Sequence, residues 1–178
     1  MKAIILDRDG VINKCMPPHQ YIKKISEVKY LEENIAIFSK LKREIPVFIA
    51  TNQQCVGKGV ISENELNEIN QNISKYLESR NIFIKKIYSC IHLESDNCNC
   101  RKPNPEMLYK IAKENRVELE NSIFIGDSET DILCAKNAKC KSIYIGKSQI
   151  NQIPTHYSKN SGQLMKILEL EKCIDIRQ

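Results

Sequence analysis

The sequence predicts an α/β fold in which an open parallel sheet is covered by helices on both faces. Short apolar runs alternate with amphipathic helical patterns along the whole chain, without internal repeats or a low-complexity linker. Polar residues that suit a ligand site directly follow three of these runs: Asp7, Thr51 and Asp127. Ligands of such sheets bind beyond the carboxyl ends of the strands. A length of 178 residues is typical of one domain with its own core, so a single domain over residues 1–178 is expected.

The first half of the chain contains three apolar runs rich in branched residues, which are expected to be strands: 1–6, 46–50 and 82–90. A helix over residues 31–42 is predicted from apolar side chains at helical spacing. A second helix begins at a Ser-x-x-Glu capping box at residues 62–65. Its apolar face is expected to be Leu66, Ile69, Ile73 and Leu77. Residues 10–30 contain a Pro-Pro pair and no periodicity, which predicts a long loop or flap.

In the second half of the chain, Asn104 and Pro105 are expected to supply the cap and the first-turn proline of a helix. Further strands are expected over 122–126 and 141–145, and further helices over 128–138 and 164–170. No insertion between these elements is long enough to form a large cap domain. The site at the strand ends is therefore expected to be covered only by loops.

The composition indicates a folded protein of the cytoplasm. Apolar residues make up 42% of the chain, and no apolar run approaches the roughly 20 residues that span a bilayer. The chain enters its first strand at once, which predicts that there is no signal peptide, and 8 cysteines in such a chain favour a reducing compartment. The net charge of +5 is dispersed, with no basic stripe interleaved with aromatics. We expect a monomer that binds neither nucleic acid nor a membrane.

The first apolar run ends in two aspartates, Asp7 and Asp9. Alternate residues of an extended chain point to the same side, so both carboxylates are expected to face one small volume. Two such anions repel each other unless a proton or a cation satisfies them. Mg²⁺ is the natural ion, because it combines a few carboxylates with water and phosphate. The alternative is a simple turn at the strand end, since Asp-Gly is a common turn dipeptide.

Four short motifs follow one another in a fixed order: Asp7-Arg8-Asp9-Gly10-Val11-Ile12-Asn13, Thr51-Asn52-Gln53, Arg101-Lys102-Pro103, and Gly126-Asp127 with Asp131. Together they resemble the haloacid dehalogenase superfamily of phosphotransferases, and the resemblance covers nearly the whole chain. The Thr-Asn-Gln stretch and a Cys-x-His…Cys-x-Cys-Arg-Lys-Pro segment are similar to those of its group of heptose-bisphosphate and histidinol-phosphate phosphatases. The resemblance implies a Rossmann-like sheet and a Mg²⁺-dependent phosphatase that forms an aspartyl phosphate.

The resemblance also implies roles for the acidic motif residues. Asp7 would attack phosphorus, and Asp9 would protonate the leaving alkoxide and then deprotonate the attacking water. Mg²⁺ would be held by Asp7, the backbone carbonyl of Asp9, and Asp127. Asp131 has two interpretations, an acid behind the metal ligands or a charge on the helix surface.

The remaining motif residues are expected to bind the phosphate group and the rest of the substrate. Thr51, with Asn52 and Gln53, would hold phosphate oxygens through side chains and backbone amides. Lys102 would offset the phosphate charge through the transition state, and Arg101 could grip a second phosphate with its bidentate fork.

A second metal site is predicted from the spacing of four soft ligands, Cys90, His92, Cys98 and Cys100. Three thiolates and one imidazole form a common closed site for structural Zn²⁺. Such an ion would fasten an irregular loop over residues 90–101 and place the Arg-Lys pair at the rim of the active site. The alternative is a set of unrelated cytosolic cysteines.

The substrate is expected to be a small phosphorylated metabolite, and two members of the resembled group compete. Gln20-Tyr21-Ile22 is similar to a Gly-Tyr-Val stretch in the flap of heptose-bisphosphate phosphatases, which favours D-glycero-D-manno-heptose 1,7-bisphosphate and removal of its 7-phosphate. The five-residue spacer between His92 and Cys98 resembles that of histidinol-phosphate phosphatases. An alternative of another class is a zinc-stabilised binding module on the same fold that hydrolyses nothing.

Overall fold

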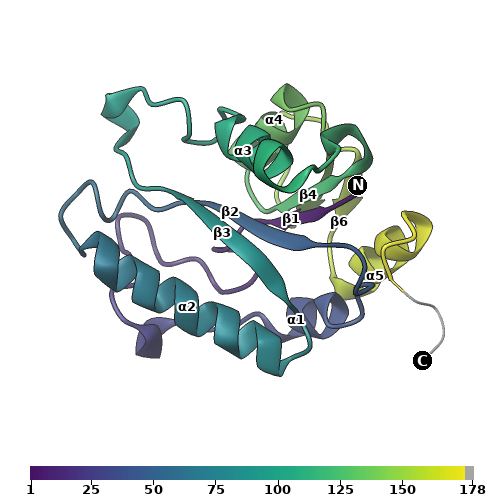
Figure 1. The fold of residues 1–178 in the computed structure, drawn as a ribbon, viewed down its shortest axis with the longest axis horizontal. Helices are drawn as coiled ribbons and strands as arrows, with labels where there is room; N and C mark the ends of the chain where they lie inside the picture. Colours follow the sequence, from purple (N-terminus) through teal and green to yellow (C-terminus); the bar gives the residue numbers. More distant parts are fainter. Residues whose placement is uncertain (175–178) are drawn as a thin grey trace.

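The structure, a computed structural model, describes residues 1–174 and contains one sheet of six strands (Figure 1). In chain order the strands are β1 (Ile4–Leu6), β2 (Val47–Asn52), β3 (Ile84–Cys90), β4 (Ile123–Gly126), β5 (Lys141–Ile145) and β6 (His156–Ser158). Every neighbouring pair is parallel, and the spatial order is β3-β2-β1-β4-β5-β6. The chain builds outward from β1 on one side and then on the other, which creates a crevice at the ends of β1 and β4. The predicted fold class is confirmed.

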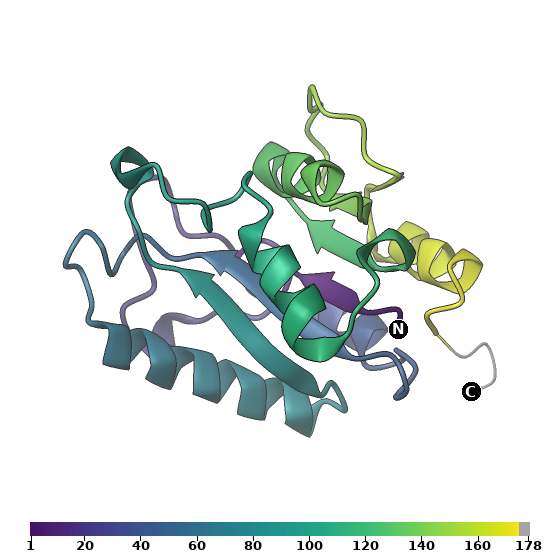
Figure 2. The same ribbon diagram turned by 45° about the horizontal axis from the view of Figure 1, so that its top comes forward.

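In the described part of the chain, five α-helices cover the two faces of the sheet: α1 (Glu32–Phe38), α2 (Glu63–Ser79), α3 (Glu106–Asn115), α4 (Glu129–Asn137) and α5 (Ser161–Leu170). Helices α1, α2 and α5 lie on one face, and α3 and α4 lie on the other (Figure 1, Figure 2). The loops that connect these described elements contain single-turn 3-10 helices over Ile25–Glu27, Glu94–Asp96 and Leu119–Asn121. Within residues 1–174, no helix combines the length and the apolar character that a bilayer crossing requires.

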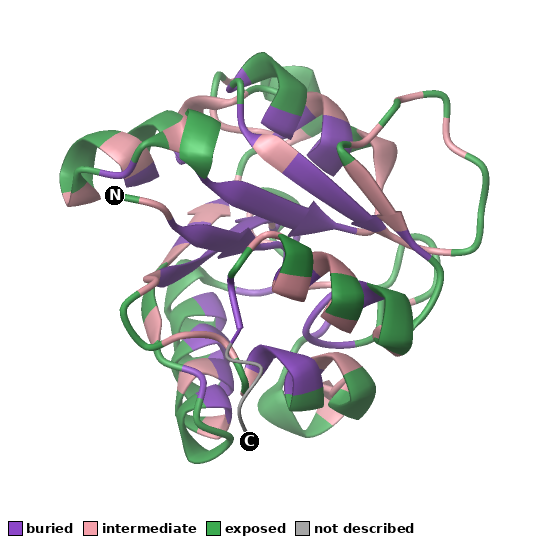
Figure 3. Cartoon of the chain, turned by 90° about the vertical axis from the view of Figure 1, so that its right-hand side faces the viewer, coloured by how far each residue is buried: buried purple, intermediate pink, exposed green. Residues whose placement is uncertain are grey.

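Strand β1 is buried on both faces, which explains its uninterrupted apolar sequence. Ile4 and Leu6 belong to the core beneath α1, α2 and α5, whereas Ile5 belongs to the core beneath α3 and α4. Figure 3 shows the central strands as buried and the outer faces of the helices as exposed. The same alternation directs the next two side chains: Asp7 contacts Lys102 on the α3 side, and Arg8 contacts a residue of α2.

Three local predictions differ from the structure. Helix α1 ends at Phe38 rather than at residue 42, because the next residues form single turns and Leu41 bridges to Ile174. Asn104 was expected to cap α3, but its side-chain amide donates to the Cys98 carbonyl (2.9 Å), and Pro105 occupies the cap position. Strand β6 was not predicted, because its three residues carry no apolar run of their own.

Candidate active site

Three acidic side chains converge where β1 and β4 end. Asp7 follows β1, Asp127 follows β4, and Asp131 lies in the first turn of α4. One carboxylate oxygen of each residue lies within 4.8 Å of those of the other two. This is the crevice at which the strand order reverses, the usual position of a ligand in an open parallel sheet. The structure thus brings together Asp7 and Asp127, which lie about 120 residues apart in the sequence, and places Asp131 beside them.

Two glycines allow the backbone to pass close to these acids. Gly10 has φ = +89°, and a Cβ at this position would lie 1.9 Å from Oδ2 of Asp127. A Cβ on Gly126 would lie 2.3 Å from the Cβ of Asp131. Both positions therefore require glycine. The Asp-Gly pair of the first motif forms a turn and also makes room for the acidic cluster.

Lys102 supplies the positive charge of this cluster. Its Nζ lies 2.8 Å from Oδ1 of Asp7 and 2.6 Å from Oδ1 of Asp131, and it donates to the Ala50 carbonyl (2.9 Å). Burial disfavours the charged ammonium, but Asp131 and Asp7 outweigh this effect and raise the pKa of Lys102 above its ordinary value. Asp131 is therefore a buried partner of the motif lysine, and its interpretation as a helix-surface charge is wrong.

The other two acids are destabilised as anions by their burial. Burial raises the pKa of the Asp7 carboxyl to about 7, although Lys102 opposes the shift. Burial, followed by the nearby Asp131, raises the pKa of the Asp127 carboxyl to about 6. Three carboxylates thus share one ammonium. A hard divalent cation would compensate the excess negative charge, and the all-oxygen donor set fits Mg²⁺.

Asp9 lies apart from this cluster and is held by three other side chains. The Arg8 guanidinium donates to both of its oxygens (3.0–3.3 Å), Asn13 Nδ2 donates to Oδ1 (2.8 Å), and Gln53 Nε2 donates to Oδ2 (2.7 Å). Burial acts to raise the pKa of Asp9, but Arg8 and these hydrogen bonds outweigh it and lower the pKa below its ordinary value. Asp9 is therefore a carboxylate whose direction is fixed, and its side chain is free of the metal cluster.

The second motif begins with the last two residues of β2 and connects several residues of the site. Thr51 is buried, and its hydroxyl accepts a hydrogen bond from Gln53 (2.9 Å). Asn52 forms a reciprocal pair with the backbone of Lys102: its Nδ2 donates to the carbonyl (3.1 Å) and its Oδ1 accepts from the N–H (3.0 Å). In this structure, Asn52 and Gln53 contact other site residues, and their predicted contacts with substrate stay a prediction.

The four predicted zinc ligands meet at the end of β3 and in the loop that follows. Ligand atoms of Cys90, His92, Cys98 and Cys100 all lie within 4.8 Å of one another. The recorded separations range from 3.2 Å, between Cys100 Sγ and Cys90 Sγ, to 3.7 Å, between Cys90 Sγ and His92 Nδ1. A tetrahedral ion with Zn–S bonds of about 2.3 Å gives edges of about 3.8 Å. The donor set and its spacing fit Zn²⁺.

Arg101 lies in the sequence between Cys100 of the cysteine cluster and Lys102 of the acidic cluster. A hollow of about 330 Å³ is lined by this arginine together with Asn52, Lys102 and Thr130, among others. The Nη1 atom of Arg101 is buried and has no hydrogen-bond partner within the described chain. A guanidinium nitrogen carries only donors, so this atom is suited to an acceptor such as a phosphate oxygen.

The predicted flap is attached to the loop that follows β2. The Tyr21 hydroxyl accepts hydrogen bonds from Gln54 (3.2 Å) and from Lys58 (2.8 Å). Near the start of the flap, the Cys15 thiol lies 3.4 Å from Oδ2 of Asp127. Residues 10–30 therefore reach the acidic cluster at one point and the second motif's loop at another.

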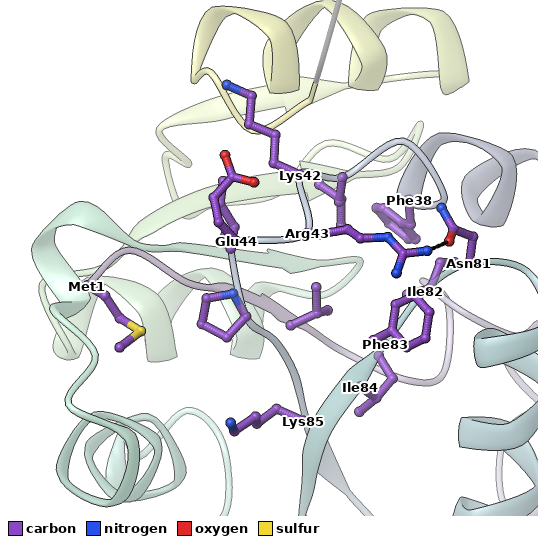
Figure 4. A pocket seen from close by; sticks show the side chains of 14 residues that line it. Met1, Phe38, Lys42, Arg43, Glu44, Asn81, Ile82, Phe83, Ile84 and Lys85 are labelled. Atoms are coloured by element: carbon purple, nitrogen blue, oxygen red, sulfur yellow. Dashed lines mark hydrogen bonds between the residues drawn. The ribbon is translucent and has the colours of Figure 1, made fainter. Parts of the chain in front are cut away.

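Two larger hollows lie away from this chemistry. One, of about 540 Å³, is at the amino ends of β2 and β3; Figure 4 shows Phe83 beneath the Arg43 guanidinium, which donates to Asn81. The other, of about 610 Å³, lies between α2 and β3. Neither is lined by a motif residue, so we place the reaction at the convergent acids and not in either of these two hollows.

Sequence reasoning gave no role to two residues that the site uses. Arg8 and Asn13 fall inside the first motif, and both donate hydrogen bonds to Asp9. For Arg8, the available signal was strand alternation, which sends it to the face opposite Asp7. For Asn13, no signal in the sequence pointed to Asp9.

Comparison with known proteins agrees with this geometry. Residues 3–145 match the sequence profile of the haloacid dehalogenase-like hydrolases. The chain is 38% identical over 138 residues to the D-glycero-alpha-D-manno-heptose-1,7-bisphosphate 7-phosphatase of Campylobacter jejuni, covering 77% of each chain. It is 34% identical over 148 residues to the beta-anomer 7-phosphatase of Helicobacter pylori, covering 79% of this chain and 81% of the relative.

Solved structures show the same likeness. The D,D-heptose 1,7-bisphosphate phosphatase of B. bronchiseptica, complexed with magnesium and phosphate, superposes with a TM-score of 0.86 at 28% identity, covering 96% of this chain and 99% of that one. A HAD-like phosphatase of Mesorhizobium loti superposes with a TM-score of 0.85 at 23% identity, a likeness of fold alone. The profile match and the two bacterial relatives agree with the ordered motifs at the strand ends. This chain therefore belongs to the haloacid dehalogenase-like hydrolases.

Proposed function

We propose that this enzyme is a phosphatase that removes the 7-phosphate of D-glycero-D-manno-heptose 1,7-bisphosphate through an aspartyl-phosphate intermediate. The observation that carries the proposal is the cluster in which Lys102 bridges Asp7 and Asp131 beside Asp127. Burying so many charged groups costs free energy. A module that only binds a ligand has no physical need to maintain such a cluster. The heptose-bisphosphate phosphatases among its relatives support the substrate.

Magnesium belongs to the proposal. Asp7 and Asp127 would hold the ion, with the backbone carbonyl of Asp9, and Asp131 would keep Lys102 in place behind them. When bound, the ion neutralises part of the charge that separates a carboxylate nucleophile from a phosphate anion. The related B. bronchiseptica enzyme has been solved with magnesium and phosphate, which supports this part of the proposal.

The reaction has two steps. In the first, a carboxylate oxygen of Asp7 forms a bond to phosphorus while the bond to the sugar oxygen breaks; Asp9, which must take up a proton when the phosphate anion binds beside it, gives that proton to the sugar oxygen. In the second, Asp9 takes a proton from water, the water oxygen bonds to phosphorus, and the bond to Asp7 breaks. The lowered pKa of Asp9 suits this second task, because only a carboxylate accepts the proton. Lys102 and Thr51 stabilise the phosphoryl oxygens.

The cysteine cluster is proposed to hold one structural Zn²⁺ that takes no part in the reaction. Burial raises the pKa of the Cys90 thiol to about 12, so its thiolate form requires a bound cation. The four ligands close the coordination shell and leave no position for substrate. The ion would fasten the loop that carries Arg101 and Lys102.

The hollow beside Arg101 favours a bisphosphate over histidinol phosphate. Arg101 presents a buried and unpaired donor at a position next to the catalytic Lys102. A second phosphate satisfies this donor and its charge, whereas the ammonium group of histidinol phosphate would meet two cations. Histidinol-phosphate phosphatase therefore stays the second candidate.

The compartment and the oligomeric state are also part of the proposal. We propose the reducing cytoplasm as the compartment, which the predicted use of cysteines as metal ligands and core residues supports. We propose a monomer, which sedimentation of the purified enzyme would test.

The direct test compares heptose 1,7-bisphosphate, histidinol phosphate and a simple aryl phosphate. The unchanged enzyme should prefer the bisphosphate, and Asp7→Asn should reduce turnover of all three to background. Arg101→Ala should lower kcat/KM for the bisphosphate by about one to two decades, and for the aryl phosphate much less. Equal losses on both would remove the role of Arg101, and a preference for histidinol phosphate would overturn the heptose assignment.

A further inference from the structure

Arg8 is a buried cation that the proposed mechanism does not use. Its side chain is only 2% exposed. Two of its nitrogens, Nε and Nη2, donate to the Asp9 carboxylate at 3.0–3.3 Å. The third, Nη1, donates to Oδ1 of Asn70 at 3.1 Å. Each guanidinium nitrogen is therefore committed within the protein, and Arg8 is not placed to bind a phosphate.

Asn70 is an unusual residue for its position in α2. The buried residues of this helix are otherwise apolar: Leu66, Ile69, Ile73 and Leu77. Asn70 is 7% exposed, and its Nδ2 donates to the Ser89 hydroxyl of β3 at 3.3 Å. An amide costs free energy to bury unless it is hydrogen-bonded, and here both halves of the amide are paired. The Oδ1 atom of Asn70 accepts a hydrogen bond from Nη1, the one guanidinium nitrogen of Arg8 that does not donate to Asp9.

We propose that Arg8 is a positioning residue for Asp9, and that Asn70 fixes Arg8, so that helix α2 sets the direction of the acid–base carboxylate. The inference rests on the proposed function. A bidentate guanidinium fixes the plane of a carboxylate as well as its distance. Asp9 must point at the leaving oxygen in one step and at water in the next. A misplacement of about 1 Å at such a group costs about 100-fold in rate.

The leaving group of the substrate gives a readout that a purely structural role of Asn70 would not move. The substrates are p-nitrophenyl phosphate, phenyl phosphate and an alkyl phosphate, in order of increasingly poor leaving groups. Poor leaving groups need the proton from Asp9, whereas p-nitrophenolate leaves with little help. In Asn70→Ala, kcat/KM should fall about tenfold or more for the alkyl phosphate and less than about threefold for p-nitrophenyl phosphate.

The second step gives an independent measurement. A misplaced Asp9 activates water poorly, so the aspartyl phosphate should accumulate in Asn70→Ala. Rapid mixing with p-nitrophenyl phosphate should then release a burst of nitrophenolate close to one equivalent of enzyme, followed by a slower steady rate. A variant that merely contains less folded enzyme gives a smaller signal but no new burst.

Matched variants complete the experiment. Asn72→Ala changes an exposed asparagine of the same helix and should leave both readouts unchanged. Asn70→Asp keeps the acceptor for Arg8 and should restore the original leaving-group dependence. If Asn70→Ala does not fold, Asn70→Ser, which is too short to reach Arg8, takes its place.

Two outcomes separate this inference from the proposed function. A folded Asn70 variant that loses kcat/KM equally on every substrate and shows no burst would overturn the positioning role. The phosphatase activity of the unchanged enzyme would not be affected by that result. An unchanged enzyme that hydrolyses no phosphate ester in the presence of Mg²⁺ would instead overturn the proposed function itself.

Discussion

At the scale of single residues, the Lys102 ammonium lies 2.8 Å from Asp7 and 2.6 Å from Asp131. Its removal would leave two buried carboxylates without a counter-charge, and breaking a buried pair in this way costs about 3–5 kcal/mol. The lysine of the third motif is therefore needed for the resting structure as well as for the proposed reaction. Asp131 keeps it in place, because it presents its own carboxylate from the first turn of α4.

Gly10 gives a sharp residue-scale prediction. In Gly10→Ala, the new methyl group would lie 1.9 Å from Oδ2 of Asp127, so the Asp127 side chain must move. We expect a loss of Mg²⁺ affinity and of turnover by about 100-fold, since the acid is a proposed metal ligand. Calorimetric titration with Mg²⁺ and steady-state kinetics measure the two effects.

The control for that change is Gly59→Ala. Gly59 also has a positive φ (+65°), but a Cβ at this position meets nothing within 4 Å. Its substitution should cost about 1 kcal/mol of backbone strain and leave Mg²⁺ binding intact. Matching losses in both variants would mean that left-handed backbone, and not contact with Asp127, explains the requirement for glycine.

At the scale of elements, the loop between β3 and α3 has no core of its own. Of residues 91–105, only Lys102 is fully buried. The cysteine cluster and the bond from Asn104 to the Cys98 carbonyl hold this loop in place. The loop carries Arg101 and Lys102, so its stability decides where the two cations lie.

Cys98→Ser tests this arrangement. The purified protein should lose its one equivalent of zinc, and its melting temperature should fall, because the binding energy of a structural metal is folding energy. Elemental analysis and thermal unfolding are the measurements. Cys140→Ser, outside the cluster, should keep its zinc. A full equivalent of zinc in Cys98→Ser, or none in the unchanged protein, would contradict the proposed site.

At the scale of the whole molecule, Glu171 connects the end of α5 and the first residues of the chain to the sheet. It follows α5, and its carboxylate lies 2.8 Å from Nζ of Lys141 in β5 and 2.9 Å from Nε2 of His156 in β6. Its backbone carbonyl accepts a hydrogen bond from Lys2, next to β1. Burial opposes the charged form, but Lys141 and His156 outweigh it and lower the pKa of Glu171.

The lowered pKa predicts a dependence of stability on pH. The stabilisation by Glu171 should be complete above its unfolded value of 4.5 and should be lost as the pH falls through the lower folded value. Glu171→Gln should therefore unfold more easily than the unchanged chain at neutral pH, and the difference should shrink below pH 4.5. Urea unfolding at both pH values measures this. Glu78→Gln, on the exposed face of α2, should show no such convergence.

Much of the fold was predictable because the central strands are buried on both faces. Such strands are continuous apolar runs, so β1, β4 and β5 lie within three residues of their predicted ends. Strand β6 was missed, since its residues gain their burial from Tyr144, which stacks on Tyr157, and from pairing with β5. The role of Asn104 was also missed, because its amide bonds to a loop carbonyl that local sequence does not specify.

The sequence by itself determined the fold class, the family motifs and the meeting of Asp7 with Asp127, because the carboxyl ends of parallel strands share one edge. Only the tertiary structure decided which interpretation of Asp131 holds, since a helix residue becomes buried or exposed through packing. It also decided that Arg8 is held between Asp9 and an asparagine of α2. The contact between Arg8 and Asn70 joins residues far apart in the chain, and its geometry depends on how helix α2 packs on the sheet and not on any local pattern.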